Sequence, residues 1–271
     1  MRLIFLGDLV GRAGREAALA AIPVLRARYS PELLIVNAEN AAHGFGITEE
    51  IFLELRDAGA DVVTLGNHSF DQREALVFIE RYRELLRPLN YPPGTPGRGA
   101  GLFTGASGAQ VLVMNVMGRV MIEPQLDDPF AATARELDLC PLKSMCDAVF
   151  IDFHAEASSE KMAFAHYVDG RVSAVVGTHT HVPTADHQVL PGGTGFLSDA
   201  GMCGDYNSVI GMDKEEPISR FTRKVPNQRM SPALGPATVC GAMIDVDPAT
   251  GLASRVQPIR MGGRLEGVMP E

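Results

Sequence analysis

Two histidines, His179 and His181, stand two positions apart in the segment "VVGTHTHVPTAD". The apolar run at residues 172–176 predicts a buried strand that ends near Gly177, so both imidazoles are expected at the mouth of that strand. Imidazole is the commonest metal ligand among side chains, and this spacing could place two of them on one centre. A polar loop with two chance histidines explains the same letters equally well, so the rest of the chain must decide.

Polar side chains with ligand chemistry also follow four other apolar runs, at residues 3–6, 33–36, 61–65 and 148–153. If these runs are parallel strands of an α/β sheet, their carboxyl ends meet at one edge, which is where ligands bind in such folds. In chain order, the side chains are Asp8, Glu39, Asn40, Asn67, His68 and His154.

The chemistry of this set favours a pair of transition-metal ions. Carboxylates, imidazoles and amide oxygens without a thiolate suit manganese, iron or zinc better than magnesium or calcium, which prefer oxygen ligands alone. A first-row ion takes about four to six ligands. The candidate ligands exceed the needs of one ion, and they are Asp8, Glu39, Asn40, Asn67, His154, His179 and His181. Paired ions about 3.5–4 Å apart are typical of enzymes that act on phosphorus. Alone, Asp8 could cap a helix, Asn40 could lie in a turn and His154 could be a core histidine; only their joint placement argues for a site.

Helical patterns between these runs indicate which elements position the polar groups. Amphipathic patterns at residues 14–29, 48–59, 71–86 and 158–168 predict helices, with Thr48 as a cap, Gly59 as an end and a kink at Pro23. The runs at 238–246 and 254–260 flank a turn and predict an antiparallel hairpin. We therefore expect an α/β fold with mixed β-sheet layers sandwiched by helices and a metal site at the C-terminal ends of the strands.

The bulk composition places limits on the function. The 271 residues are 46% hydrophobic and 21% charged, as in an ordinary globular protein, and are expected to form a single domain, residues 1–271. The net charge of −9 argues against general nucleic-acid binding. Neither a membrane-spanning run nor a signal segment is evident, and the four cysteines form no CxxC pair, so we expect a cytoplasmic protein with reduced thiols.

Three other functions compete with a phosphoesterase. The first alternative is a nucleotide-binding P-loop in the segment "GDLVGRAGR", but this segment lacks the GK[ST] ending of a P-loop. An amidohydrolase also uses a His-x-His pair, but after the first strand of a barrel, whereas here the pair follows residue 170. The third alternative is a metal-stabilised regulatory or interaction protein with little turnover, which stoichiometric metal without hydrolysis of any phosphodiester would favour.

The motifs "GDLVG", "GNHSFD" and "GTHTH", with a lone histidine at His154, resemble those of the calcineurin-like metallophosphoesterases. The segments "NAENAAHGFGIT", "DFHAEASSEKMA" and "SDAGMCGDYNSVIGM" are similar to the bacterial branch of cyclic-nucleotide phosphodiesterases. The resemblance extends from Leu3 to about Met212. It implies the calcineurin-like phosphoesterase fold and the hydrolysis of 2′,3′- or 3′,5′-cyclic nucleotides by a metal-activated hydroxide.

The resemblance also implies a role for each candidate residue. Glu39 would bridge two divalent ions, with iron or manganese expected, and His68 would act as the catalytic acid or contact the phosphate. His179 and His181 are expected to point the same way along an extended segment and to serve different ions. The first site would consist of Asp8, Glu39, Asn40 and His181, and the second of Glu39, Asn67, His154 and His179.

Some positions depart from the wider family or remain open. Val10 stands where most members have a histidine, Glu39 replaces the usual aspartate, and Ser69 replaces the Asp that usually follows "GNH". These changes leave metal identity and affinity open. His43 and Phe45 are weaker candidates for the substrate pocket, where Phe45 would stack on a base or simply pack its own loop. The segment 199–212 could cover the site or form a contact in a homo-oligomer.

Overall fold

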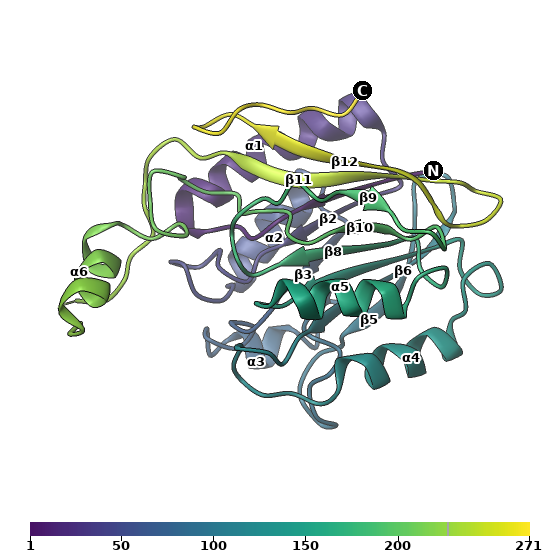
Figure 1. The fold of residues 1–271 in the computed structure, drawn as a ribbon, viewed down its shortest axis with the longest axis horizontal. Coiled ribbons are helices and arrows are strands. Elements are labelled where there is room, and N and C mark those ends of the chain that lie inside the picture. The colour runs from purple at the N-terminus through teal and green to yellow at the C-terminus, as the bar shows by residue number, and fades with distance from the viewer. Residues whose placement is uncertain (227) are drawn as a thin grey trace.

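Two six-stranded mixed sheets lie face to face, and helices cover their outer sides (Figure 1). The computed structural model describes residues 1–226 and 228–271. The first sheet contains β1 (Arg2–Leu6), β2 (Leu33–Asn37), β3 (Val62–Thr64), β4 (Leu85–Leu86), β11 (Val239–Val246) and β12 (Ala253–Met261), in the order β12-β11-β1-β2-β3-β4. The second contains β5 (Ala100–Thr104), β6 (Gln110–Met117), β7 (Ala148–His154), β8 (Ala174–Thr178), β9 (Gln188–Val189) and β10 (Gly195–Leu197), in the order β5-β6-β7-β8-β10-β9.

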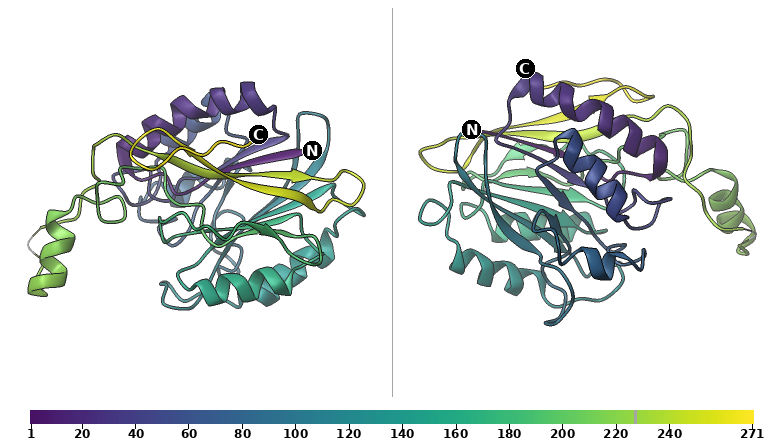
Figure 2. Two further views of the ribbon diagram at one scale, coloured as in Figure 1. Left: turned by 45° about the horizontal axis from the view of Figure 1, so that its top comes forward. Right: turned by 180° about the vertical axis from the view of Figure 1, so that it is seen from behind.

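The helices form two outer layers and one projection. The helices are α1 (Gly11–Tyr29), α2 (Glu49–Ala58), α3 (Ala75–Phe78), α4 (Pro129–Leu139), α5 (Ser158–Tyr167) and α6 (Glu215–Arg223). Helices α1 and α2 pack on the first sheet, while α4 and α5 pack on the second (Figures 1 and 2). Helix α6 stands off the body in all three views. Within the described residues, no helix is both long and apolar enough to cross a membrane.

Apolar side chains on both faces of the strands explain this layering. Along β1, Leu3 and Phe5 point into the layer between the sheets, whereas Ile4 and Leu6 point toward the helices. Successive side chains of a strand alternate between faces, so a run that is apolar throughout requires cover on both. The rings of Phe5 and Phe150 lie 5.2 Å apart between the sheets. This packing confirms the predicted α/β class with mixed sheets.

The strands that carry the candidate ligands are parallel within each sheet. Strand β1 pairs with β2 and β2 with β3 in the first sheet, and β7 pairs with β8 in the second, all in parallel. Their carboxyl ends therefore lie on the same side of the molecule, which is the geometry that the sequence predicted for the site. The closing hairpin of β11 and β12 is antiparallel, as expected.

Individual helices and strands confirm some of the sequence predictions and contradict others. The Thr48 hydroxyl accepts a hydrogen bond from the Ile51 amide, which confirms the helix cap. The long helix predicted at residues 71–86 is wrong: only α3 forms, and Leu85 and Leu86 pair with β3 as the edge strand β4. Helix α1 continues through Pro23. Helices α4 and α6 were not predicted from the sequence.

Candidate metal centre

Seven predicted ligands converge where the five parallel strands end. Asp8 follows β1, Glu39 and Asn40 follow β2, and Asn67 follows β3, all from the first sheet. His154 ends β7 on the second sheet, and His179 and His181 follow β8. The side chains of Asp8, Glu39 and His154 are almost completely buried. The site therefore lies in the seam between the two sheets.

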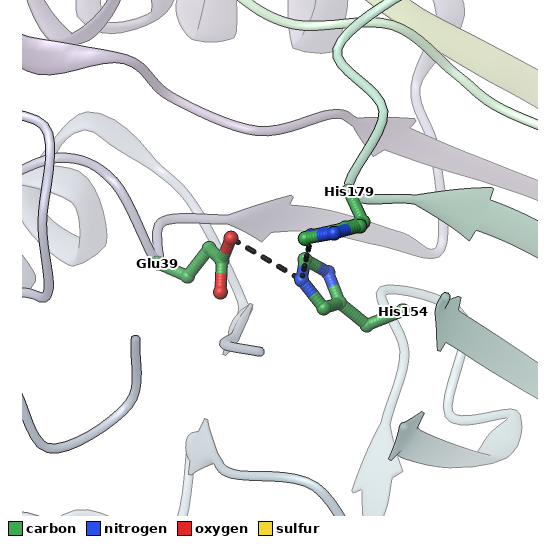
Figure 3. Close-up of side chains that lie close together, drawn as sticks. All are labelled: Glu39, His154 and His179. Carbon is green, nitrogen blue, oxygen red and sulfur yellow. Dashed lines mark hydrogen bonds and ion pairs between the residues drawn. The ribbon is translucent and has the colours of Figure 1, made fainter. Parts of the chain in front are cut away.

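Ligand atoms in this seam form two groups that share one carboxylate. Glu39, His154 and His179 place ligand atoms within 4.8 Å of one another, and so do Asp8, Glu39 and His181. Figure 3 shows the first group, with the Glu39 carboxylate and the His179 ring both directed at the ring of His154. Membership of Glu39 in both groups is the arrangement expected of a bridging carboxylate.

The Nε2 atom of His154 is the focus of the first group. It lies 2.9 Å from Asn67 Oδ1, 3.2 Å from Glu39 Oε1 and 3.1 Å from His179 Nδ1. Such a concentration of lone-pair atoms around one ring nitrogen suits a shared cation. His179 Nε2 also lies 3.3 Å from a carboxylate oxygen of Glu156 at the rim.

In the second group, His181 is oriented by a backbone carbonyl. Its Nδ1 lies 2.7 Å from the Ile210 carbonyl oxygen, to which it donates, and this leaves Nε2 free to face Asn40 Oδ1 at 3.2 Å. The Asn40 amide nitrogen donates to the Gly44 carbonyl, so its oxygen is the atom that faces the site. A ligand imidazole usually donates its other nitrogen in this way, which fixes its tautomer and direction.

The backbone of the His-x-His segment differs from the expected extended conformation. Strand β8 ends at Thr178, and both histidines have positive φ, 96° at His179 and 66° at His181. The expectation that they share a direction along an extended segment is therefore wrong. The turn instead directs His179 to the group around His154 and His181 to the group around Asp8.

A buried ion pair stabilises the turn that carries His179 and His181. The Asp199 carboxylate accepts hydrogen bonds from the amide and hydroxyl of Thr180, the residue between the two histidines, at 3.1 and 2.8 Å. The Lys161 ammonium of α5 lies 2.7 Å from the same oxygen, and both side chains are buried. An unpaired charge at this depth would be costly, so the pair fixes the turn firmly.

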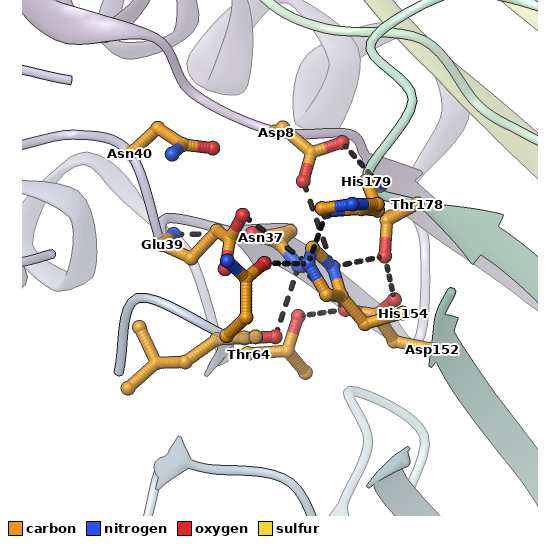
Figure 4. A network of polar contacts seen from close by, with 12 residues as sticks. Asp8, Asn37, Glu39, Asn40, Thr64, Asp152, His154, Thr178 and His179 are labelled. Atoms are coloured by element: carbon orange, nitrogen blue, oxygen red, sulfur yellow. Dashed lines mark hydrogen bonds and ion pairs between the residues drawn. The ribbon is translucent and has the colours of Figure 1, made fainter. Parts of the chain in front are cut away.

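A second buried carboxylate, Asp152 of β7, supports the ligands from below (Figure 4). It accepts hydrogen bonds from Asn37, Thr64 and Thr178 at 2.9, 2.5 and 2.6 Å. Because the Thr178 hydroxyl donates to Asp152, it can only accept from His154 Nδ1, 2.9 Å away. Asn37 in turn accepts from the Glu39 amide at 3.1 Å. Asp152 thereby orients a ligand imidazole and the backbone of the shared carboxylate.

The electrostatics of the site show competition between burial and opposite charge. Burial raises the pKa of Asp8 to about 6, against the opposing charges of His181 and His154. Burial also disfavours the charge of Glu39, but the neighbouring His154 outweighs it and holds the pKa of this carboxyl below its usual range. Burial favours the neutral form of His154, but the negative charge of Glu39 favours the protonated form more strongly. The net effect raises the pKa of His154 to about 9. Burial and the charge of His154 lower the pKa of His179 to about 3.

The residues present fit metal ions on three observations. Asp8 Oδ1 is buried and has no hydrogen-bond partner among the described residues. A side chain at Gly66 would clash with Glu39 and with the His154 ring, so glycine is needed for the strand end to approach the ligands. The donor set of carboxylates, imidazoles and amide oxygens suits first-row transition metals.

A cavity of about 430 Å³ opens beside the ligands. His68 and Phe45 line it, and their rings meet edge to face at 5.2 Å. The His68 ring is held through Nδ1 by the Asp71 carboxylate at 2.8 Å, while its amide donates to Glu39. His43 is exposed and is not among the residues that line the cavity.

Several residues that support the site were not predicted from the sequence. Asp152 lies two positions before His154 on the same strand, so the alternation of side chains could have placed both on one face. Asp71 follows His68 by three residues in "HSFD", so it could also have been proposed from the sequence. Lys161 and Asp199, by contrast, meet only through tertiary packing. The segment 199–212 supports the His-x-His turn through Asp199 and also lines the cavity.

Two facing mixed sheets with a carboxylate- and histidine-rich centre at the strand ends define a phosphoesterase of the metallophosphoesterase type. The chain belongs to the YmdB-like protein family, which it matches over residues 4–259. It is 46% identical to a 2′,3′-cyclic-nucleotide 2′-phosphodiesterase of Bacillus subtilis over 259 residues, 96% of each chain.

Two solved structures are also similar. A hypothetical protein from Thermus thermophilus has a TM-score of 0.89 and 42% identity, covering 97% of this chain and 100% of that one. A phosphatase from Mycoplasma pneumoniae has a TM-score of 0.88 and 34% identity, covering 97% and 93%. Together with the family, they confirm the predicted resemblance, the fold class and the hydrolase class.

Proposed function

We propose that this chain hydrolyses the phosphodiester of 2′,3′-cyclic nucleotides at a centre of two divalent metal ions. The observation that carries the proposal is the shared Glu39 carboxylate, which belongs to both groups of ligand atoms. The activity of the Bacillus subtilis relative, a 2′,3′-cyclic-nucleotide 2′-phosphodiesterase, supports this substrate class, and the relatives give no support to the 3′,5′-cyclic alternative. Residues 1–271 would act as one domain, since a single apolar layer joins the two sheets.

Each candidate ligand has a defined place in this proposal. Asp8, Asn40 and His181 would hold one ion, Asn67, His154 and His179 would hold the other, and Glu39 would contact both. The mixed oxygen and nitrogen donors favour iron or manganese. When bound, such ions polarise the phosphoryl oxygens and lower the pKa of water to near neutrality.

His68 would protonate the leaving oxygen. It lines the cavity, and Asp71 fixes its ring through Nδ1, so Nε2 is the atom available to a substrate. In the reaction, an oxygen from water forms a bond to phosphorus, the bond from phosphorus to the 2′ oxygen breaks, and that oxygen takes a proton. His68 would donate this proton as a general acid. The products are a nucleoside 3′-phosphate with a free 2′-hydroxyl.

Elemental analysis and turnover test the proposal together. Protein purified without chelators should contain two ions per chain and convert 2′,3′-cyclic AMP to 3′-AMP. A single firmly bound ion would contradict the paired centre. Two ions without turnover on any phosphodiester would favour the metal-stabilised regulatory alternative, although the Asp71-oriented ring of His68 in the cavity argues for catalysis.

A further inference from the structure

The cavity beside the metal centre has one polar side and one apolar side. Glu39, His68, His179 and His181 border it where the candidate ions would lie. The remaining wall is largely apolar, from Phe45, Val209, Ile210, Met212, Phe221 and Met230. Its volume, about 430 Å³, falls within the range of small-molecule sites, which usually combine an apolar lining with a few placed polar groups.

Helix α6 contributes the outer part of the apolar wall. Pro217, Arg220 and Phe221 all line the cavity, and their spacing places them on one face of the helix. Ile218 lies on the same helix but does not line the cavity. The helix stands off the body in Figures 1 and 2. Because these three residues line the same cavity as the candidate ligands, this face of the helix borders the space beside the metal centre.

The charge on this wall is already neutralised. The Arg220 guanidinium lies 2.7 Å from a Glu216 carboxylate oxygen and donates a further hydrogen bond to the Gln228 carbonyl at 3.0 Å. It is therefore committed to groups of its own segment. The wall offers aromatic and thioether surface to a ligand, which suits a flat ring more than a phosphate or a sugar.

The apolar wall is also connected to a metal ligand. Ile210 lines the cavity with its side chain, 55% exposed, while its carbonyl oxygen accepts from His181 Nδ1. Its φ of 47° is unusual for a β-branched residue. The segment is thus held in a strained conformation that serves both the wall and the ligand, and strain of this kind clusters at functional sites.

We propose that this cavity is the nucleobase subsite and that Phe221 is a specificity-determining residue that stacks on the base. The inference rests on the proposed function, because a cyclic phosphate held at the ligands has only its sugar and base left to occupy the cavity. Phe221 is 73% exposed, so its ring is free to pack on a ligand. Phe45, beside His68, provides a second aromatic surface from a separate element.

The test compares Phe221→Ala with Ile218→Ala, a matched control on the same helix with a similarly exposed side chain, 53% exposed. Stacking of a base on an aromatic ring is worth about 1–3 kcal/mol, so Phe221→Ala should lower kcat/KM for 2′,3′-cyclic AMP by roughly 5–150-fold, mainly through KM. The base-free analogue, methyl riboside 2′,3′-cyclic phosphate, should be unaffected. Calorimetric titration with adenosine should show the same loss of affinity without any turnover.

Each outcome decides one question. Equal losses for the base-free and base-containing substrates, or equal effects of Phe221→Ala and Ile218→Ala, would overturn the nucleobase subsite. A wild-type protein that hydrolyses both substrates with the same kcat/KM would also overturn it while leaving the proposed function intact. A wild-type protein that hydrolyses neither would contradict the proposed function, and the adenosine titration would still decide whether Phe221 binds a base.

Discussion

Replacing Asp152 with asparagine tests whether the buried network under the site controls metal binding. Asp152 is inaccessible to solvent, and its two oxygens receive hydrogen bonds from Asn37, Thr64 and Thr178. All three neighbours donate, so the amide nitrogen of Asp152→Asn would have to face a donor. The substitution keeps the size of the side chain and removes one acceptor and the negative charge.

The expected magnitude follows from the path through Thr178. In the wild type, Thr178 gives its proton to Asp152 and accepts from His154 Nδ1, which makes Nε2 the ring nitrogen that faces the ligand group. A hydrogen bond to a charged group contributes about 1.5–3 kcal/mol. At about 1.4 kcal/mol per factor of ten, its loss corresponds to roughly 10–100-fold in metal affinity. Removal of the partners that orient a metal ligand typically costs about the same factor.

The assay is a calorimetric titration of Mn²⁺ into chelator-treated protein, with thermal unfolding measured alongside. Ser173→Ala is the matched control, because Ser173 is buried directly before β8, accepts from the Val149 amide and donates to the Gly251 carbonyl. Both variants should lose stability, but only Asp152→Asn should bind Mn²⁺ about 10–100-fold more weakly. Wild-type affinity in a folded Asp152→Asn variant would refute the reasoning and leave Asp152 with a structural role only.

Three further predictions concern the ligands and His68. Glu39→Ala should weaken both metal sites and Asn40→Ala mainly one, as metal titration would show; equal, mild losses would mean that Glu39 does not bridge. His68→Ala should retain its metals but lose roughly 10²–10⁴ in rate, most on diesters with poor leaving groups; full activity would remove it from the mechanism. In metal-free protein the pKa of His154 rises from 6.5 to about 9. Stability from its protonated form, roughly 3 kcal/mol, is complete below about pH 6.5 and is lost as the pH rises through 9. The midpoint temperature of thermal unfolding should therefore fall in the wild type as the pH rises over that range. It should not show this fall in His154→Asn.

Much of the fold could be predicted because its signals are local. Runs such as residues 33–36 are apolar throughout, and only a sheet covered on both faces accommodates several of them. The polar residues that follow these runs need no knowledge of distant contacts. Parallel pairing of β1 with β2 then brings Asp8 and Glu39 together, and the packing of the second sheet on the first adds His154. The candidate ligands of a metal centre can therefore be predicted from the sequence.

The parts that could not be predicted depend on tertiary contacts. Residues 71–86 have a helical pattern, but pairing of Leu85 and Leu86 with β3 is favoured over another helical turn, since tertiary context overrides propensity. Helix α6 follows a segment rich in Gly and polar residues and stands off the body (Figure 1). The pair of Lys161 and Asp199 joins residues 38 positions apart. Such contacts can be proposed only once the fold is known.

The conformation of the His-x-His turn explains why the site needs this buried support. An extended segment would place His179 and His181 on one face, but two groups of ligand atoms require two directions. Positive φ at both histidines provides those directions, and sparsely populated backbone conformations of this kind cost about 1–3 kcal/mol each. Such a turn persists only if its surroundings over-determine it, and the hydrogen bonds from Thr180 to the buried Asp199 supply that constraint. The ion pair with Lys161 is thus part of the ligand geometry, even though neither of its members faces the site.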